Sequence, residues 1–395
     1  MSKKTIAQLQ DLRGKRVLIR VDFNVPMDKQ GNITNDRRIR SAVPTIETVL
    51  KAGGSAIVMS HLGRPSGDPE EDKRLRMDRI GTRLGELLNK SVTVADDFDD
   101  SMTSAAQSLK DGEVLLLQNL RFHPGEKEGD AKFASKLAAL ADVYVNDAFG
   151  TCHRQDASMV AVPAAMKGKP RVVGLLVAKE LEILDQLLSN PDRPFLGILG
   201  GAKVSDKIGF IKAMLQQVDK VLIGGAMRYT FLKAQGKKIG TSKCENDKLH
   251  LAEELLELGG DKIILPIDSV VVEDIGKPEQ AQVVEGDIPD HLGGVDIGPK
   301  SLEMFQKEIA QSKTVVWNGP MGIFEVDEYS KGTRGVADAM ASLNGVTIVG
   351  GGETAEAVEV FGLAESMTHV STGGGAFLEY VEGMPFVALE QIDEA

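Results

Sequence analysis

The chain has 395 residues, of which 42% are hydrophobic and 26% charged, and its formal net charge at pH 7 is −12. This composition is typical of a globular protein with two or three domains, and the acidic balance argues against nucleic acid or an anionic membrane as the main partner. The only two cysteines, Cys152 and Cys244, lie far apart in the sequence, which excludes a disulfide scaffold and a zinc ribbon.

The chain starts with MSKKTIAQ, which lacks the apolar region of a secretion signal. No later stretch approaches the roughly 20 apolar residues that a membrane-spanning helix needs. We therefore expect a cytoplasmic protein.

Short apolar runs rich in β-branched residues alternate with longer amphipathic stretches along the whole chain. The runs are typical of buried strands, and the stretches have the apolar spacing of helices. The predicted strands are 16–23, 56–61, 114–118, 143–146, 195–199, 220–223, 262–265, 314–317, 346–349 and 369–371. The predicted helices are 131–141, 181–188, 207–216 and 249–258. This alternation indicates an α/β protein with parallel sheets.

Two features predict a domain boundary within residues 172–193. A long predicted helix that begins near Leu175 is followed by the breaker sequence SNPDRP at 189–194. The first 185 residues carry 28 Lys and Arg against 26 Asp and Glu, whereas the rest carry 18 against 32. We expect two lobes of similar size, each a mainly parallel, Rossmann-like sheet flanked by helices.

Nearly every predicted strand is followed by a small cluster of Gly and polar residues. The clusters lie at 22–24, 61–64, 119–121, 146–150, 200–203, 224–225, 318–320, 350–354 and 373–375. Ligands of parallel α/β sheets bind outside the carboxyl ends of the strands, so these clusters predict a binding edge in each lobe. A single cluster is equally well explained as a turn that needs Gly.

The Gly-rich clusters of the second lobe suit phosphate groups. The sequence GGAKVSDK at 200–207 follows an apolar strand and leads into a helix, so its backbone N–H groups and two lysines can face an anion. Similar loops occur at 350–355 and 373–375, and three such loops suit the phosphate chain of a nucleotide. Glu353 is the only acid within them. It is a candidate partner for nucleotide-bound Mg²⁺, or else an acid that stabilises a helix N-terminus.

The first lobe concentrates cations, since 14 of the 17 arginines lie before residue 186. A set of arginines that converges with a histidine would bind a small molecule carrying both phosphate and carboxylate. Each arginine taken alone is more often a surface residue. The candidates at or after strand ends are Asp22, Asn24, His61, Arg64, Arg121, His153 and Arg154, and Arg38 lies in a polar stretch.

Eight segments, in order, make the chain resemble the phosphoglycerate kinase family from end to end. They are VDFNVP (21–26), SHLGRP (60–65), NLRFH (119–123), NDAFGTCHR (146–154), LGGAKV (199–204), WNGPMG (317–322), GGGET (350–354) and STGGG (371–375).

The resemblance implies reversible, Mg²⁺-dependent transfer of the acyl phosphate of 1,3-bisphosphoglycerate to ADP, giving 3-phosphoglycerate and ATP. The first lobe, 1–172, would bind 3-phosphoglycerate through Asp22, Phe23, Asn24, Arg38, His61, Leu62, Gly63, Arg64, Arg121 and Arg154. The second lobe, 194–384, would bind Mg-nucleotide through Gly201, Ala202, Lys203, Lys207, Gly225, Gly294, Asn318, Pro320, Glu325, Gly351, Gly352, Glu353 and Thr354, with Glu353 as the metal ligand.

The resemblance also implies how the lobes work together. A helix and hinge at 173–193 would join them, and residues 385–395 would return to the first lobe. Arg38, Lys203 and the N–H groups of Gly373 and Gly374 would surround the transferred phosphoryl group as the hinge closes. The family resemblance favours a monomer.

Two positions depart from the family's usual pattern. Glu353 stands where the family usually has Asp, which predicts retained activity with an altered preference between Mg²⁺ and Mn²⁺. Arg228 stands where the family usually has Ala. Its side chain could contact the nucleotide or point to solvent, and we favour the solvent-exposed position.

The adjacent His153 and Arg154 suggest a lowered pKa and oxidant sensitivity for Cys152.

Other classes of function fit less well. An NAD-dependent dehydrogenase needs Gly-x-Gly-x-x-Gly at the first strand-to-helix turn, where this chain has Asn-Val-Pro at 24–26. A two-lobed binding protein would usually carry an export signal and would need only one ligand surface. A catalytically inactive member of the family is a further alternative, for which Glu353 is the only argument.

Overall fold

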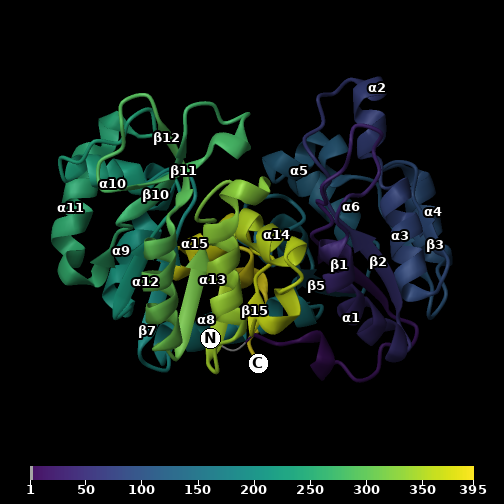
Figure 1. The fold of residues 1–395 in the computed structure, drawn as a ribbon. Helices are drawn as coiled ribbons and strands as arrows, with labels where there is room; N and C mark the ends of the chain where they lie inside the picture. The colour runs from purple at the N-terminus through teal and green to yellow at the C-terminus, as the bar shows by residue number, and fades with distance from the viewer. Residues whose placement is uncertain (1–2) are drawn as a thin grey trace. The chain divides into compact units, whose positions relative to one another are not determined.

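The computed structural model describes residues 3–395, which fold into two compact units. The first unit contains the residues up to Glu182 together with Pro385–Ala395, and the second is Ile183–Met384. Figure 1 colours the first unit mainly purple and blue and the second mainly teal, green and yellow. The hinge expected at 173–193 stays a prediction.

The first unit is built on six parallel strands in the order β3-β4-β2-β1-β5-β6. The strands are β1 (Arg16–Val21), β2 (Ser55–Met59), β3 (Val92–Val94), β4 (Val114–Leu116), β5 (Val143–Asp147) and β6 (Arg171–Val173). The helices are α1 (Arg37–Lys51), α2 (Pro69–Asp72), α3 (Asp78–Leu88), α4 (Asp100–Ser108), α5 (Pro124–Glu128), α6 (Ala131–Ala138) and α7 (Ala161–Ala165), followed by α8 (Leu175–Ser189), which runs into the second unit. Because all strands are parallel, their carboxyl ends meet at one edge of the sheet.

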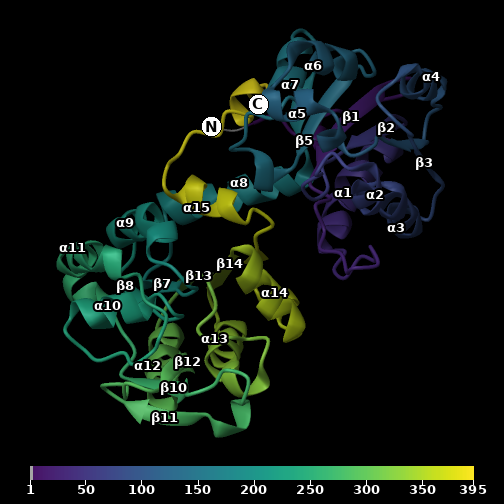
Figure 2. The ribbon, with the colours of Figure 1, turned by 90° about the horizontal axis from the view of Figure 1, so that it is seen from above.

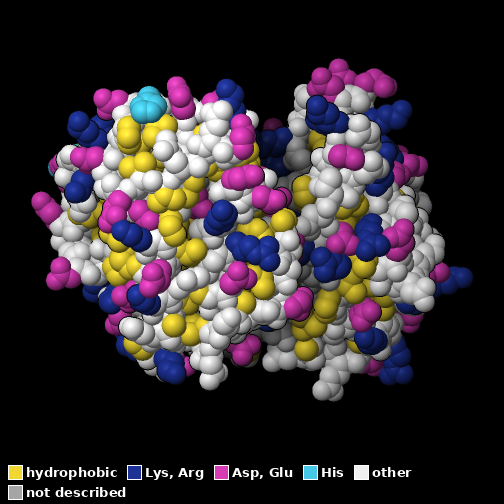
Figure 3. Space-filling view, viewed as in Figure 1, with side chains coloured by type: hydrophobic (Ala, Val, Ile, Leu, Met, Phe, Trp, Pro, Cys, Tyr) yellow, Lys and Arg dark blue, Asp and Glu magenta, His cyan; other side chains and the backbone are white. Residues whose placement is uncertain are grey.

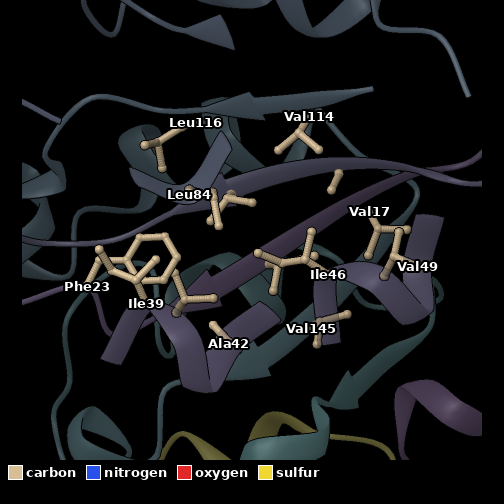
Figure 4. Close-up of a cluster of buried hydrophobic side chains, with 14 of the residues drawn as sticks. Val17, Phe23, Ile39, Ala42, Ile46, Val49, Leu84, Val114, Leu116 and Val145 are labelled. Atoms are coloured by element: carbon tan, nitrogen blue, oxygen red, sulfur yellow. The ribbon is translucent and has the colours of Figure 1, made fainter. Parts of the chain in front are cut away.

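Helix α1 packs on this sheet through one apolar stripe. Ile39, Ala42, Ile46 and Val49 follow helical spacing, are fully buried, and point at strand residues such as Val17 (Figure 4). Helix α3 adds its own buried leucine and isoleucine side chains to the same cluster. This core fixes the strands whose ends carry the polar clusters.

The C-terminal segment closes the first unit beside β6. The N–H of Lys4 donates to the carbonyl of Asp393, and the N–H of Asp393 donates to the carbonyl of Arg171, both at 2.9 Å. The carboxylate of Asp393 also pairs with the Arg171 guanidinium at 2.7 Å. The two ends of the chain are therefore tied together by backbone and side-chain bonds.

The second unit has a six-stranded parallel sheet in the order β15-β14-β13-β7-β8-β9. Its strands are β7 (Phe195–Leu199), β8 (Lys220–Ile223), β9 (Ile263–Ile264), β13 (Thr314–Asn318), β14 (Val346–Gly350) and β15 (His369–Val370). Three further strands, β10 (Asp268–Val272), β11 (Gln282–Glu285) and β12 (Gly293–Ile297), form a separate antiparallel sheet.

The helices of the second unit cover both faces of the parallel sheet. They are α9 (Ile208–Gln217), α10 (Arg228–Ala234), α11 (Leu249–Gly259), α12 (Pro299–Ala310), α13 (Lys331–Ala341), α14 (Gly352–Val360) and α15 (Gly375–Val381). Figure 2 shows α9 and α15 on one side of the strands and α12 and α13 on the other. The sheet order reverses between β7 and β13, which is the position where α/β sheets of this kind bind ligands.

The structure confirms the predicted fold class and all ten predicted strands, with bounds that differ by a few residues. The four predicted helices are also present. The prediction missed β3, β6 and the antiparallel sheet. Strands β3 and β11 have mostly exposed or half-buried side chains, so they lack the apolar run by which a buried strand is identified.

Charged side chains of both signs are spread over the visible surface (Figure 3). Acidic side chains gather at the tip of the first unit over α2, whose sequence is PEED (Figure 3). Within residues 3–395, none of the helices combines the length and apolar character needed to cross a bilayer.

We predict that Ile46→Ala destabilises the first unit by about 2–5 kcal/mol, because it leaves a cavity in a fully packed core. Leu50→Ala on the same helix is the control, since Leu50 is only half-buried and should cost less. Urea unfolding of both variants measures the difference. Equal losses of stability in the two variants would contradict this packing.

Candidate active site

Loops at the carboxyl edge of the first sheet enclose a basic groove. The hollow has a volume of about 400 Å³ and is lined by Arg64, Pro65, Arg121, Lys127 and Arg154. Of its four cations, only Lys127 takes part in an ion pair of residues 3–395, with Asp156 at 2.9 Å. The structure thus brings three predicted arginines together without carboxylate partners. Such a groove suits a small molecule that carries several negative charges.

Arg121 is only partly satisfied by its neighbours in this groove. Its Nη1 donates to the carbonyl of Gly63 at 2.6 Å, whereas its buried Nε has no hydrogen-bond partner. Burial and the nearby Arg154 guanidinium lower the pKa of Arg121. An anion in the groove would reduce the repulsion between these two cations.

His61 lies at the end of β2 with only 1% of its surface exposed. The Nη2 of Arg20 contacts its Nδ1 at 3.2 Å. Because a guanidinium can only donate, Nδ1 must accept, and the ring proton therefore sits on Nε2. Burial lowers the pKa of His61 to about 2. His61 is thus a neutral donor, and its 4.0 Å approach to Asp22 is not an ion pair of charged groups.

Asp22 holds Arg38 at the rim of the site. Burial acts to raise the pKa of Asp22, but the surrounding charges, foremost the Arg38 guanidinium in contact with it, and a hydrogen bond from the N–H of Asn24 together outweigh this effect, and the pKa falls to about 2. The ionised carboxylate orients Arg38, whose side chain in the first turn of α1 remains 32% exposed. Arg38 can therefore contact a ligand while one side of it stays fixed.

Three predicted substrate residues also make contacts within the protein. The side chains of Phe23 and Leu62 belong to the hydrophobic core, and their N–H groups donate to Ser60 and Asn119. The N–H of Gly63 donates to Oδ1 of Asn24 at 2.8 Å. The bonds of Phe23 and Gly63 tie the loop after β1 to the loop after β2, and the bond of Leu62 ties the loop after β2 to the loop after β4.

Sequence reasoning missed a buried polar chain beneath His61. The Nε of Arg20 donates to Oγ of Ser158 at 2.8 Å, and Ser158 donates to Glu126 through Oγ at 2.6 Å and through its N–H at 3.0 Å. All three residues are fully buried. An arginine inside the apolar strand VLIRV was the available signal, because a buried arginine needs dedicated partners.

The second unit contains a larger pocket, of about 720 Å³, at the point where its sheet order reverses. Seven predicted residues line it: Gly201, Ala202, Gly225, Gly294, Pro320, Glu325 and Glu353. Its other wall consists of residues 241–243, 272–275 and 293–295, which belong to or adjoin the antiparallel sheet. That wall was largely missed because its strands were not predicted.

Backbone bonds between glycine loops form the floor of this pocket. The N–H of Gly201 donates to the carbonyl of Pro320 at 2.9 Å, and the N–H of Gly225 donates to that of Met321 at 3.1 Å. A Cβ at Gly225, which has φ +60°, would overlap the backbone of Gly201. Only glycine permits this approach.

The two predicted lysines are placed differently. Lys203 is exposed in the loop after β7 and does not line the pocket. The Nζ of Lys207 donates to the carbonyls of Gly200 at 2.7 Å and Asn318 at 3.2 Å. Burial lowers the pKa of Lys207 to about 8. Lys207 therefore lies directly under the loops where an anion would bind.

The remaining predicted nucleotide residues surround the pocket without lining it. Asn318 donates to the carbonyl of Gly350 at 3.0 Å, and the N–H of Gly319 donates to Oγ1 of Thr354 at 2.6 Å. Gly351 and Gly352 lie at the N-terminus of α14, with the exposed Glu353 in its first turn. Gly373 and Gly374 precede α15, also outside the pocket lining.

The expectation that Arg228 is solvent-exposed is wrong. We favoured a solvent-exposed side chain, yet Arg228 is 1% exposed and lines the pocket from below. Its guanidinium bonds to backbone carbonyls of the surrounding loops and stacks over the Tyr229 ring, 4.3 Å from its centroid. These partners compensate for its desolvation.

The proposed reactivity of Cys152 is also wrong. The thiol is fully buried, and burial raises its pKa to about 12. Its neighbours in sequence direct their side chains elsewhere, Arg154 into the basic groove and His153 toward Phe386. A buried neutral thiol of this kind resists oxidation.

Comparison with known proteins identifies relatives over the full chain. A family model described as phosphoglycerate kinase matches residues 6–384. The phosphoglycerate kinase of Rhodopirellula baltica is 54% identical over 399 residues, and that of Anaeromyxobacter dehalogenans is 50% identical; each alignment covers 100% of both chains.

Solved structures agree with these relatives. A phosphoglycerate kinase from Coxiella burnetii superposes with a TM-score of 0.86 at 37% identity and covers 98% of both chains. A second one, from Pyrococcus horikoshii, gives a TM-score of 0.86 at 30% identity over 97% of both chains.

We predict that the affinity for ADP falls above pH 8. Below its pKa of about 8, Lys207 is an ammonium that attracts phosphate, and above it the amine is neutral. The loss should be about tenfold, the scale of one charge-assisted hydrogen bond. Calorimetric titration with ADP from pH 6.5 to 9.5 measures it.

Two variants of Lys207 serve as controls. Lys207→Arg keeps its charge throughout this range, so its affinity should stay level, while Lys207→Met should bind weakly at every pH. If the wild type and Lys207→Arg lose affinity in parallel above pH 8, another group is responsible.

Proposed function

The chain belongs to the phosphoglycerate kinase family and is a phosphotransferase of glycolysis, and we propose that its first unit binds 3-phosphoglycerate while its second binds the nucleotide. The contrast between the two sites supports this division. The groove of the first unit contains three arginines without ion-pair partners, whereas the pocket of the second unit is built on glycine loops. The cations of the groove match the negative charge of 3-phosphoglycerate, and the larger pocket has the size that a nucleotide needs.

In the first unit, the phosphate and carboxylate of 3-phosphoglycerate are the groups that the cations would bind. Arg64, Arg121 and Arg154 supply unpaired guanidinium groups, and Arg38 is oriented by Asp22. Neutral His61 donates through Nε2. The bond between Gly63 and Asn24 keeps the loop beside them in place.

The chemistry requires no general base in the direction of ATP use. The acceptor is a carboxylate, which is ionised at neutral pH and is already a nucleophile. The state of His61 agrees with this, because its Nδ1 accepts from Arg20 and its low pKa prevents it from taking up a proton. Catalysis then depends on positioning and on neutralising negative charge.

In the second unit, Mg²⁺ would arrive with the nucleotide. Mg²⁺ at kinase sites is typically held by one or two carboxylates together with the substrate phosphates. Glu353 lines the pocket and is exposed, and residues 3–395 contain no group of three or more His, Cys, Asp or Glu that would form a separate metal cage. These residues fit a nucleotide-borne ion, which when bound neutralises part of the phosphate charge.

The transfer step needs groups from both units. We assign Arg38 and Lys203 to the two sides of the transferred phosphoryl group, with the N–H groups of Gly373 and Gly374 completing its binding. Since the ligands occupy different units, closure about residues 173–193 would bring them together and exclude water that hydrolyses an acyl phosphate. The same family assignment supports a cytoplasmic monomer.

We predict that Arg38→Ala lowers kcat by about 10²–10³, because a preorganised charge next to the transferred group is lost. Lys203→Ala should lower kcat to a similar extent, because Lys203 is assigned to the nucleotide side of the same phosphoryl group. Turnover is measured with 3-phosphoglycerate, ATP and Mg²⁺, coupled to NADH oxidation by glyceraldehyde-3-phosphate dehydrogenase, with reactions lacking each substrate as blanks.

Matched controls lie close to both residues in the sequence. Arg40→Ala on α1 and Lys212→Ala on α9 remove exposed cations and should leave kcat unchanged. A wild type without turnover that still binds both ligands would be an inactive member of the family. An Arg38→Ala variant that raises only KM would contradict the role of Arg38 in the transition state.

Glu353 provides a separate prediction. The Glu side chain is one methylene longer than that of Asp, so the coordination geometry of a bound ion should shift. This shift should change the ratio of the activities with Mg²⁺ and Mn²⁺. Titration of both metals on the wild type and on Glu353→Asp tests this. Superimposable profiles for the two proteins would show that this carboxylate does not contact the ion.

A further inference from the structure

Arg228 joins two different sheets beneath the pocket of the second unit. It is the first residue of α10 and is 1% exposed. Its Nη1 donates to the carbonyl of Gly225 at 3.0 Å and lies 3.4 Å from that of Met321. Its Nη2 donates to the carbonyl of Asp296 at 2.7 Å, to Oγ of Ser269 at 3.3 Å and to the hydroxyl of Tyr229.

These partners belong to opposite walls of the pocket. Gly225 and Met321 lie in the loops after β8 and β13 of the parallel sheet. Ser269 and Asp296 lie in β10 and β12 of the antiparallel sheet. Both sets of elements line the pocket. The planar guanidinium therefore sets the distance between the two walls in a way that a flexible, single-headed side chain cannot.

Tyr229 extends this connection to the pocket surface. Its hydroxyl accepts from Arg228 and lies where a Cβ at Gly294 would be. Gly294, itself part of the lining, rests against that hydroxyl. The position of this part of the wall thus depends on Arg228 through Tyr229.

Arg228 also affects the charge of the pocket. Four carboxylates line it, those of Glu273, Asp274, Glu325 and Glu353, and its only other lining cation is Lys243. No ion pair of residues 3–395 includes Arg228, and its buried Nε has no hydrogen-bond partner.

The buried acid Asp296 offsets this charge only in part. The carboxylate of Asp296 accepts from the N–H groups of Ile297 at 2.8 Å and Gly332 at 2.6 Å, not from the guanidinium. Burial raises the pKa of Asp296 to about 7, so a part of it is neutral at physiological pH. The buried guanidinium is therefore a positive charge at the pocket that offsets part of the negative charge of its four carboxylates.

We propose that Arg228 is a positioning residue for the nucleotide: it fixes the two walls at the spacing that a nucleoside needs and offsets the acidic lining that would repel the phosphates. The inference rests on the nucleotide site proposed above. It predicts an effect on nucleotide affinity that is separate from 3-phosphoglycerate binding and from the chemical step.

Two substitutions test it. Arg228→Met keeps most of the side-chain volume but removes the charge and the hydrogen bonds, while Tyr229→Phe removes only the hydroxyl that Arg228 contacts. We expect Arg228→Met to raise the calorimetric Kd for ADP and the KM for ATP by about tenfold or more, with kcat within about threefold and the KM for 3-phosphoglycerate unchanged. Tyr229→Phe should give a smaller change in the same direction.

Arg334→Met is the matched control. Arg334 lies on α13 of the same unit, is half exposed, stacks over Phe361 and does not line the pocket, so its loss should leave the ADP affinity unchanged. Arg228→Lys keeps the charge but cannot bond to both walls. An affinity between those of the wild type and Arg228→Met would support both parts of the role.

Three results would overturn the proposal. The first is an unchanged Kd for ADP in Arg228→Met. The second is a parallel rise in the KM values for ATP and 3-phosphoglycerate, together with a fall in kcat and in thermal stability, because that combination indicates a purely structural residue. If Arg228→Met does not fold, an unchanged ADP Kd in both Arg228→Lys and Tyr229→Phe has the same meaning. A wild type that fails to bind ADP would instead overturn the nucleotide site itself, and the two failures are thereby distinguished.

Discussion

Close approach of backbone segments at the carboxyl edge of a parallel sheet is the constraint on which this molecule depends. In the second unit, the loop after β7 bonds to the loop after β13, and the loop after β8 bonds to both through Gly225 and Met227. A side chain cannot occupy the closest of these positions, such as Gly225, so this part of the pocket surface consists of main chain. This close approach also gathers carbonyl oxygens under the pocket, and each of them needs a hydrogen-bond donor in the folded state.

Buried cations satisfy that requirement in both units. Lys207 and Arg228 donate to carbonyls of the loops in the second unit, and Arg20 in the first donates to the carbonyl of Val21 as well as to Ser158 and His61. Each cation orders groups that surround a ligand, so stabilisation of the fold and preparation of the site are achieved by the same bonds. Because Arg20 and Arg228 are buried, salt screens their charges little.

The sequence pattern predicted the parallel sheets because strands such as β1 and β13 are buried on both faces and appear as uninterrupted apolar runs. It did not predict β11, which is mostly exposed, or the pocket wall that the antiparallel sheet provides. The arginine groove followed from residues just after strand ends. Arg228 and Cys152 were misjudged because neighbours in sequence do not determine whether a side chain faces solvent or a buried carbonyl, and the same limit hid Arg20 and Glu126.

The bond between the chain ends has a consequence for the order of folding during translation. The last residues bury Phe386, Ala388 and Ile392 in the first unit, although the whole second unit lies between them and the rest of that unit in the sequence. A ribosome makes residues 183–384 before these residues exist. The first unit, although begun earlier, can therefore be completed only after residues 385–395 have been made, which is after the whole of the second unit.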